Sequence, residues 1–183
     1  MPGWNFADVW EVIAQQLPDA PCQIQGDRRI SWDEFDRRSN GVAQTLLDAG
    51  VAEQDKVAQY LYNCPEYIES MFAGFKAGLV PINTNYRYQD DELVYLWDNA
   101  DCAAVVFHGS FTATIERIRD RVPGVTLWLW VDDDSGPCPE WAADADAAAA
   151  TPSEGPVGWP WVWSGGDVWF LYCGGMTGLS KGA

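Results

Sequence analysis

Amphipathic segments with helical spacing alternate with short apolar runs along the first 131 residues. The helical segments cover residues 6–17, 32–49, 65–77, 90–99 and 111–122. The apolar runs cover residues 57–62, 79–82, 102–107 and 125–131, and a small hairpin joins residues 23–25 to 28–31. Strands that alternate with helices of about 10 to 15 residues are typical of crossover connections on a parallel sheet. The sequence therefore predicts an α/β fold of alternating helices and mostly parallel strands.

Several of these helices carry their own start and stop signals. Ser31 and Glu34 form the S-x-x-E pattern of a capping box, and Pro65 is a residue type favoured at a first helical position. Gly50 and Gly78 follow helical segments, and glycine commonly ends a helix because it adopts the left-handed conformation at little cost. The first helix has one apolar face, which consists of Phe6, Val9, Trp10, Ile13 and Leu17.

The alternation stops at residues 132–165. This stretch holds three successive aspartates, a run rich in alanine and several prolines, which is the composition of a solvated linker or an insertion. Its four tryptophans favour packing of some of it onto the domain, whereas a membrane-interface patch is disfavoured because no basic residue accompanies them. We therefore divide the chain into three parts. These are an α/β N-terminal subdomain at 1–131, an acidic Ala/Pro/Trp-rich linker or insertion at 132–165, and a strand with a glycine-rich loop at 166–183.

The charge balance excludes several classes of partner. The chain has 27 acidic and 11 basic residues, a net charge of −16, and no cluster of Lys and Arg. Non-specific binding to nucleic acid or to an anionic membrane needs such clusters. No apolar run approaches the roughly 18 to 20 residues of a membrane-spanning helix. We therefore expect no nucleic-acid partner and no membrane span, and a bound anion would need backbone amides or a single lysine.

Five cysteines are scattered along the chain without a CxxC pair, and His108 is the only histidine. The cysteines are Cys22, Cys64, Cys102, Cys138 and Cys173. This spacing does not fit a zinc site. An odd number of dispersed thiols, with no secretory signal at residues 1–4, predicts free thiols and a cytoplasmic location. A nucleophile–histidine triad could use only His108, for which a surface position at a strand end is the simpler interpretation.

A glycine-rich segment follows the last predicted strand. Residues 167–172 are predicted to form a buried strand, and residues 173–182 then hold four glycines and Lys181. Glycine-rich backbone can turn successive N–H groups toward one point and so form a nest for phosphate. Lys181 would add a positive charge. Because the spacing differs from the G-x-x-x-x-G-K pattern of a P-loop, a plain glycine-rich turn is the alternative interpretation.

Residues 172–182 resemble the phosphate-loop signature of the adenylate-forming superfamily, Y-T-S/G-G-T-T-G-x-P-K-G. Three other segments resemble motifs of the same family. They are residues 31–35 (S/T-Y-x-E-L), residues 74–83 (G-x-x-K-A-G-A-x-x-x-x-x-N) and residues 86–101 (a helix that starts with R-x-x-x-x-E-L). The last of these is most similar to bacterial fatty-acid and steroid-acid CoA ligases. The resemblance covers essentially the whole chain, but only the first third or so of such an enzyme.

The resemblance implies the N-terminal subdomain of an ATP-dependent, AMP-forming acyl-CoA ligase. Such an enzyme joins a carboxylic acid, here a fatty or steroid acid, to AMP with release of pyrophosphate, and then transfers the acyl group to coenzyme A. ATP with Mg²⁺ is the implied cofactor, and coenzyme A is the co-substrate. The residues implied to bind the phosphates are Cys173, Gly174, Gly175, Met176, Thr177, Gly178 and Lys181. The family places its catalytic lysine and its magnesium-binding glutamate beyond Ala183, so no catalytic or metal-binding residue is assigned.

Three loop positions depart from the family pattern. Cys173 and Met176 stand in place of threonines, and Ser180 stands in place of proline. The loss of two hydroxyl groups predicts weaker phosphate binding, because a hydrogen bond to a charged group contributes about 1.5–3 kcal/mol. We expect the chain alone to be inactive in adenylation and to self-associate through exposed apolar surface. Two alternatives stay open: a non-catalytic, degenerate α/β module that binds a partner, and a nucleotide-binding protein of another class.

Overall fold

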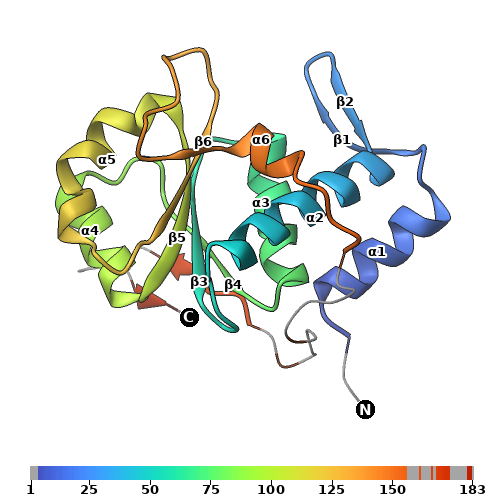
Figure 1. Ribbon diagram of the computed structural model, residues 1–183, viewed down its shortest axis with the longest axis horizontal. Helices are drawn as coiled ribbons and strands as arrows, with labels where there is room; N and C mark the ends of the chain where they lie inside the picture. Colours follow the sequence, from blue (N-terminus) through green and yellow to red (C-terminus); the bar gives the residue numbers. More distant parts are fainter. Residues whose placement is uncertain (1–3, 156–160, 162–165, 167, 174–180, 183) are drawn as a thin grey trace.

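The computed structural model describes residues 4–155, 161, 166, 168–173 and 181–182 (Figure 1). Within these residues, five strands form a central sheet in the order β4-β3-β5-β6-β7. They are β3 (Lys56–Tyr60), β4 (Val80–Asn83), β5 (Cys102–His108), β6 (Leu127–Val131) and β7 (Ala143–Asp144). Every neighbouring pair of these strands is parallel, which confirms the predicted α/β fold.

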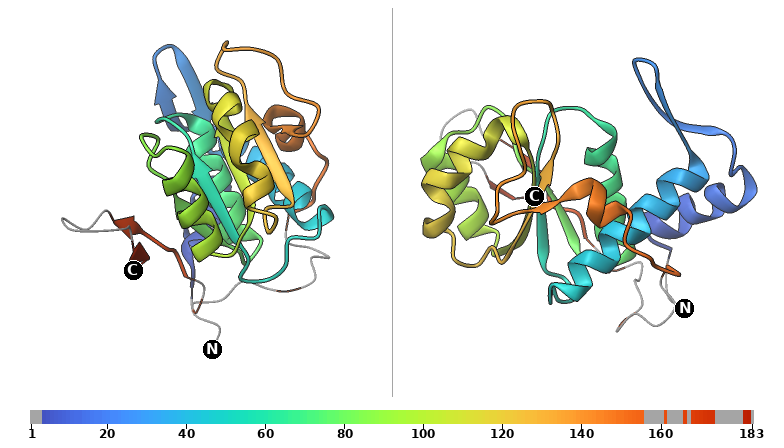
Figure 2. Two further views of the ribbon diagram at one scale, coloured as in Figure 1. Left: turned by 90° about the vertical axis from the view of Figure 1, so that its left-hand side faces the viewer. Right: turned by 45° about the horizontal axis from the view of Figure 1, so that its top comes forward.

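Helices cover both faces of the sheet (Figures 1 and 2). One face carries α4 (Asp90–Asn99) and α5 (Thr112–Ile118), with short 3₁₀ turns at Gly109–Phe111 and Arg119–Arg121 on either side of α5. The other face carries α2 (Trp32–Asp48), α3 (Pro65–Lys76) and α6 (Ala145–Ala149). Beyond α2 and α3 lie α1 (Phe6–Gln16) and a hairpin of β1 (Pro21–Gln25) and β2 (Arg28–Ser31). No helix among the described residues has the length and apolar character needed to cross a membrane.

Two apolar cores lie on the two faces of the sheet, and the central strand β5 contributes side chains to both cores. Val105 and Phe107 pack toward α4 and α5, whereas Ala104 and Val106 pack toward α2, α3 and α6. This alternation follows from the two-residue period of a strand. Burial on both faces explains why the strands appear in the sequence as continuous apolar runs.

The predicted helix ends agree with the structure. Ser31 accepts a hydrogen bond from the backbone N–H of Glu34 at the start of α2, and Pro65 is the first residue of α3. Gly50 and Gly78 have φ angles of 84° and 63°, as expected for glycines that follow helices. Local sequence signals thus placed most element boundaries.

The packing of α1 differs from the pattern of its sequence. Ala7 and Ala14 are its buried residues, whereas Phe6, Val9 and Leu17 are 54%, 42% and 56% exposed. The small side chains allow α1 to approach α2 and α3 closely. The predicted helix is therefore confirmed, but only part of its apolar stripe packs against the domain: the ring of Trp10 lies 5.0 Å from that of Phe72 in α3, whereas Phe6, Val9 and Leu17 are largely exposed.

Residues 132–155 contain secondary structure that the sequence did not reveal. β7 pairs with β6 at the edge of the sheet, and α6 packs against α2. The ring of Trp141 stacks on Phe107 at a centroid distance of 5.6 Å. Further along, Trp161 donates a hydrogen bond from Nε1 to the carbonyl oxygen of Ala77 at 2.6 Å. Much of the segment assigned to a linker or insertion therefore packs on the domain.

The buried strand predicted at residues 167–172 is wrong in length and in burial, and Asp167 itself lies outside the described residues. The structure has β8 only at Tyr172–Cys173, preceded by a single bridge between Phe170 and Ile82. Trp169 and Leu171 are 37% and 39% exposed, whereas Tyr172 is buried. This segment lies at the edge of the sheet, beside β4, and alternate side chains therefore face solvent.

Candidate functional site

The two ends of the glycine-rich segment lie side by side. β8 (Tyr172–Cys173) pairs antiparallel with β9 (Lys181–Gly182), so that Tyr172 is opposite Gly182 and Cys173 is opposite Lys181. The backbone at Cys173 and at Lys181 is thereby brought together. The other predicted site residues, Gly174, Gly175, Met176, Thr177 and Gly178, lie outside the described residues, and the phosphate nest stays a prediction.

The hairpin begins at the carboxyl end of β4. The backbone N–H of Phe170 donates to the carbonyl oxygen of Pro81 at 3.2 Å. Two residues later, the backbone N–H of Tyr172 donates to Asn83 Oδ1 at 3.0 Å. Open α/β sheets commonly bind ligands outside the carboxyl ends of their strands. The location of the hairpin therefore suits a ligand-binding loop.

Tyr172 is anchored through its side chain as well. Its hydroxyl group donates a hydrogen bond to Asn99 Oδ1 at 3.1 Å, at the end of α4. Burial raises the pKa of Tyr172, so the hydroxyl group stays protonated at neutral pH and available as a donor. This tyrosine is therefore an anchor of the hairpin rather than an acid or a base.

Asn83 closes the family-like motif at residues 74–83, yet its contact with Tyr172 joins positions 89 residues apart. Its place at the end of a predicted strand was a signal that it lies near the ligand-binding edge. Asn99 carried no such signal, because its side chain meets Tyr172 only through the tertiary fold.

His108 is buried at the carboxyl end of β5, and the surface position predicted for it is wrong. Its side chain is 5% exposed and packs against the rings of Tyr62 and Phe111. Nδ1 accepts a hydrogen bond from the backbone N–H of Tyr62 at 3.0 Å. Burial lowers its pKa below the usual value, although the charges of Asp133 and Glu66 oppose this. A neutral imidazole with Nδ1 already occupied supports a structural role for His108.

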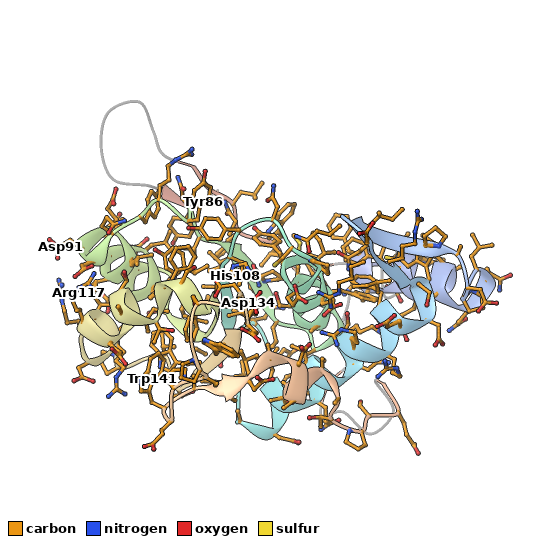
Figure 3. The ribbon with its side chains drawn as sticks, turned by 90° about the horizontal axis from the view of Figure 1, so that it is seen from above. Tyr86, Asp91, His108, Arg117, Asp134 and Trp141 are labelled. Atoms are coloured by element: carbon orange, nitrogen blue, oxygen red, sulfur yellow. The ribbon has the colours of Figure 1, made fainter. Side chains whose placement is uncertain are left out.

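Aromatic and acidic side chains surround the other strand ends at this edge. Tyr86 follows β4, and its ring lies 5.1 Å from the ring of Tyr62, which follows β3. Figure 3 shows Tyr86 beside the segment that carries the hairpin, and His108 and Asp134 nearer the middle of the molecule. The carboxylate of Asp133 accepts hydrogen bonds from the backbone N–H groups of Ser110 and Ser135. No group of three metal-ligating side chains occurs in the described part of the chain.

Two cavities elsewhere are less suited to phosphate. One of about 320 Å³ lies at the amino ends of the strands and is lined by the carboxylates of Asp55, Asp98 and Asp101. These negative charges would repel an anion. The other, of about 640 Å³, lies beside α5 and has Glu116 as its only charged lining residue. Neither of these two cavities has a lysine or an arginine in its lining.

Lys76, which belongs to the motif at residues 74–83, is a structural residue. It is 1% exposed, and its Nζ lies 2.7 Å from Asp36 Oδ1 in α2 and 2.5 Å from Glu11 Oε1 in α1. The ammonium group also lies 4.6 Å from the ring centroid of Phe72. Lys76 therefore joins three helices and is not available to a ligand.

Known proteins resemble this chain in sequence. The model of a family described as "AMP-binding enzyme" matches residues 10–183. A medium/long-chain-fatty-acid–CoA/3-oxocholest-4-en-26-oate–CoA ligase of Mycobacterium marinum is 32% identical over 97% of this chain and 33% of its own length. The medium-chain acyl-CoA ligase Mig of Mycobacterium avium is 31% identical over 95% of this chain and 34% of its own length.

Solved structures show the same fold. The anthranilate CoA ligase AuaEII in complex with anthranoyl-AMP superposes with a TM-score of 0.88 at 20% identity, over all of this chain and 34% of that one. The N-terminal domain of FACL13 from Mycobacterium tuberculosis has a TM-score of 0.79 at 23% identity, over all of this chain and 44% of that one. The present chain thus spans about a third of the length of the curated relatives it matches and corresponds to their N-terminal part.

Proposed function

Because the chain belongs to the AMP-binding enzyme family, we propose that it is the N-terminal part of an ATP-dependent acyl-CoA ligase for a fatty or steroid carboxylic acid. In the proposed reaction, the carboxylate attacks the α-phosphorus of ATP and pyrophosphate leaves, which gives an acyl-adenylate. The thiol of coenzyme A then takes the acyl group and AMP leaves. The free thiols among the described cysteines are compatible with a cytoplasmic location, which we include in the proposal.

The observation that carries the proposal is the pairing of Cys173 with Lys181 at the carboxyl end of β4. The pairing places Cys173 and Lys181, which flank the glycine-rich segment in the sequence, near the carboxyl end of β4, and open α/β sheets commonly bind ligands at that edge. We assign Gly174, Gly175, Thr177, Gly178 and the backbone of Cys173 and Met176 to the departing phosphates. Lys181 supplies positive charge.

Magnesium has no assigned site in this proposal. The described residues hold no cluster of carboxylates and imidazoles suited to it, so an ion that arrives with ATP would be held by the phosphates and by residues outside this part.

We further propose that the chain alone does not form an acyl-adenylate. Holding the carboxylate in line with the α-phosphate contributes about 7–11 kcal/mol to such a reaction, and the loop addresses only the departing phosphates. The relatives are about three times as long as this chain, which agrees with further binding groups elsewhere in their sequences. Exposed apolar residues such as Trp4 and Phe6 support self-association of the isolated chain.

One observation favours a second candidate function. Met176 and Cys173 remove two of the hydroxyl groups typical of the loop, which is compatible with a degenerate module that no longer binds ATP. Direct binding measurements separate the two candidates.

A chimera tests the proposed function. Residues 10–183 would replace the matching N-terminal third of the M. marinum ligase, and acid-dependent exchange of labelled pyrophosphate into ATP would be measured with medium-chain, long-chain and steroid acids. We expect exchange by the chimera and none by the chain alone. A folded chimera without exchange, even after Cys173→Thr and Met176→Thr, would support the degenerate module instead.

A further inference from the structure

We propose that Asn83 is the positioning residue of the glycine-rich loop, because its side chain takes the place of a backbone acceptor in the sheet. The inference rests on the proposed function of that loop. It concerns a residue that does not itself contact phosphate.

The hydrogen-bond pattern shows that the side chain of Asn83 replaces a backbone acceptor. Phe170 bridges Ile82 in a parallel register, and its N–H group donates to the carbonyl oxygen of Pro81. In a regular parallel ladder, the next N–H group on the same edge, that of Tyr172, would donate to the backbone carbonyl of Asn83. It donates instead to Oδ1 of the Asn83 side chain, at 3.0 Å. The backbone at Tyr172, where β8 begins, is therefore separated from β4 by the length of the Asn83 side chain.

This displacement explains why the chain leaves the sheet at Tyr172. The β3–β4 ladder continues past Asn83, since the N–H group of Thr84 donates to the carbonyl oxygen of Gln59. Tyr172 turns away from β4 and pairs with Gly182 in the hairpin. Asn83 thus both ends the pairing with β4 and holds the first residue of the loop.

The side chain of Tyr172 makes this position rigid. Its ring is buried in the core between the sheet and α4, and its hydroxyl group donates to Asn99. The backbone of Tyr172 is tied to Asn83 and its side chain to Asn99, so Cys173 starts from a fixed point. Because Lys181 pairs with Cys173, its backbone position depends on the same contact.

Two measurements on the full chain test the proposal. The first is hydrogen exchange at the backbone amides of Phe170, Tyr172, Cys173, Lys181 and Gly182, which needs no ligand. We expect Asn83→Ala to raise exchange at least tenfold at these amides while the thermal midpoint stays close to that of the parent. Asn83→Asp retains an acceptor in the same place and should restore slow exchange.

The second is calorimetric titration with pyrophosphate. We expect Asn83→Ala to weaken binding about five- to tenfold, as expected for the loss of one net hydrogen bond. The matched control is Asn85→Ala, two residues away, whose side chain accepts from the N–H group of Arg87 in a local turn. This control should leave both readouts unchanged.

The outcomes are distinct. Unchanged amide exchange in Asn83→Ala would overturn the positioning role, and so would a pyrophosphate affinity that is measurable in the parent and equal in this variant. Faster exchange in Asn83→Ala, reversed in Asn83→Asp, would support the role even if the parent binds no pyrophosphate. In that last case only the proposed function of the loop would fail.

Discussion

The α-carbon of Gly41 in α2 faces the backbone carbonyl groups of Ala149 and Ala148 in α6. A methyl group at Gly41 would overlap the carbonyl oxygen of Ala149 and lie 2.8 Å from that of Ala148. The absence of a side chain therefore allows α6 to pack against α2, although the two helices are about 100 residues apart in the sequence.

Gly41→Ala is expected to destabilise the protein. In an isolated helix the same change stabilises by about 1 kcal/mol, so a loss of roughly 1–3 kcal/mol would reveal the overlap with α6. Urea unfolding measures it. Gly124→Ala is the control, because its methyl group would lie 3.5 Å from the carbonyl oxygen of Cys102, an ordinary contact. A stabilised Gly41→Ala variant would show that α6 does not pack as described.

The contact between Gly41 and α6 separates what the sequence could predict from what it could not. Helices and strands up to residue 131 follow from periodicity and from local signals such as Ser31, Pro65 and Gly78, because these act within a few residues of themselves. α6 is five residues long and is capped locally by Asp144, but its packing against α2 depends on the tertiary contact with Gly41. Local patterns cannot report such a contact.

The candidate site was predictable in kind but not in position. The glycines and Lys181 indicated the loop, whereas the place of Asn83 after a predicted strand was a signal that the prediction did not use. The exchange of a backbone acceptor for the Asn83 side chain depends on the register between segments far apart in the chain. The burial of His108 depends in part on long-range packing, since Tyr62 lies against it from a position 46 residues earlier in the chain.

Stability should fall at acid pH in a way that depends on His108. Its pKa in the folded protein lies below the value of about 6.5 expected in the unfolded chain. The unfolded chain therefore binds the proton more readily. The stabilising contribution of the neutral ring is fully present above pH ~6.5 and is lost as pH falls through the folded pKa.

Thermal unfolding of the parent and of His108→Asn across pH ~4.5 to ~7.5 tests this expectation. Asparagine can still accept from the N–H group of Tyr62 but does not titrate in this range. The parent should lose more stability than the variant on acidification. If the stability of the parent and the variant fell equally with pH, the lowered pKa of His108 would be contradicted.

Arg38 should be essential for stability because it neutralises the buried carboxylate of Glu69. Its guanidinium group donates from Nε to both carboxylate oxygens of Glu69, at 2.9 and 3.0 Å, and Glu69 is 2% exposed. Burial raises the pKa of Glu69, and the arginine opposes that shift. Removing one partner of a buried ion pair typically costs about 3–5 kcal/mol.

We therefore expect Arg38→Met to destabilise strongly and the double variant Arg38→Met/Glu69→Met to recover much of the loss. Chemical denaturation of the two variants and the parent provides the comparison. Equal losses in the single and double variants would show that the uncompensated charge of Glu69 is not the cause.

All five cysteines are expected to be free. Among the side chains that the structure describes, Cys22, Cys64, Cys102 and Cys138 are unpaired. Burial raises the pKa of Cys22 to about 11 and that of Cys64 and Cys102 to about 12, so these thiols should react slowly in the native protein at neutral pH. Titration of the denatured, unreduced protein should then find five thiols, and three or fewer would reveal a disulfide.

Restoring the hydroxyl groups of the loop should strengthen phosphate binding. Cys173→Thr and Met176→Thr together add two donors, each worth about 1.5–3 kcal/mol toward a charged phosphate, so the affinity should rise by about tenfold or more. Lys181→Ala should lower it, because the loop would lose its positive charge. The departures from the family pattern would then account for weak binding by the parent.

Calorimetric titration of the purified chain with pyrophosphate and with ATP at low salt decides whether residues 173–182 bind phosphate. We expect one weak site in the parent, tighter binding in Cys173→Thr/Met176→Thr, and no measurable binding in Lys181→Ala. Absence of binding in the parent and in the hydroxyl-restored variant, with both proteins folded, would contradict the assignment of this segment to phosphate.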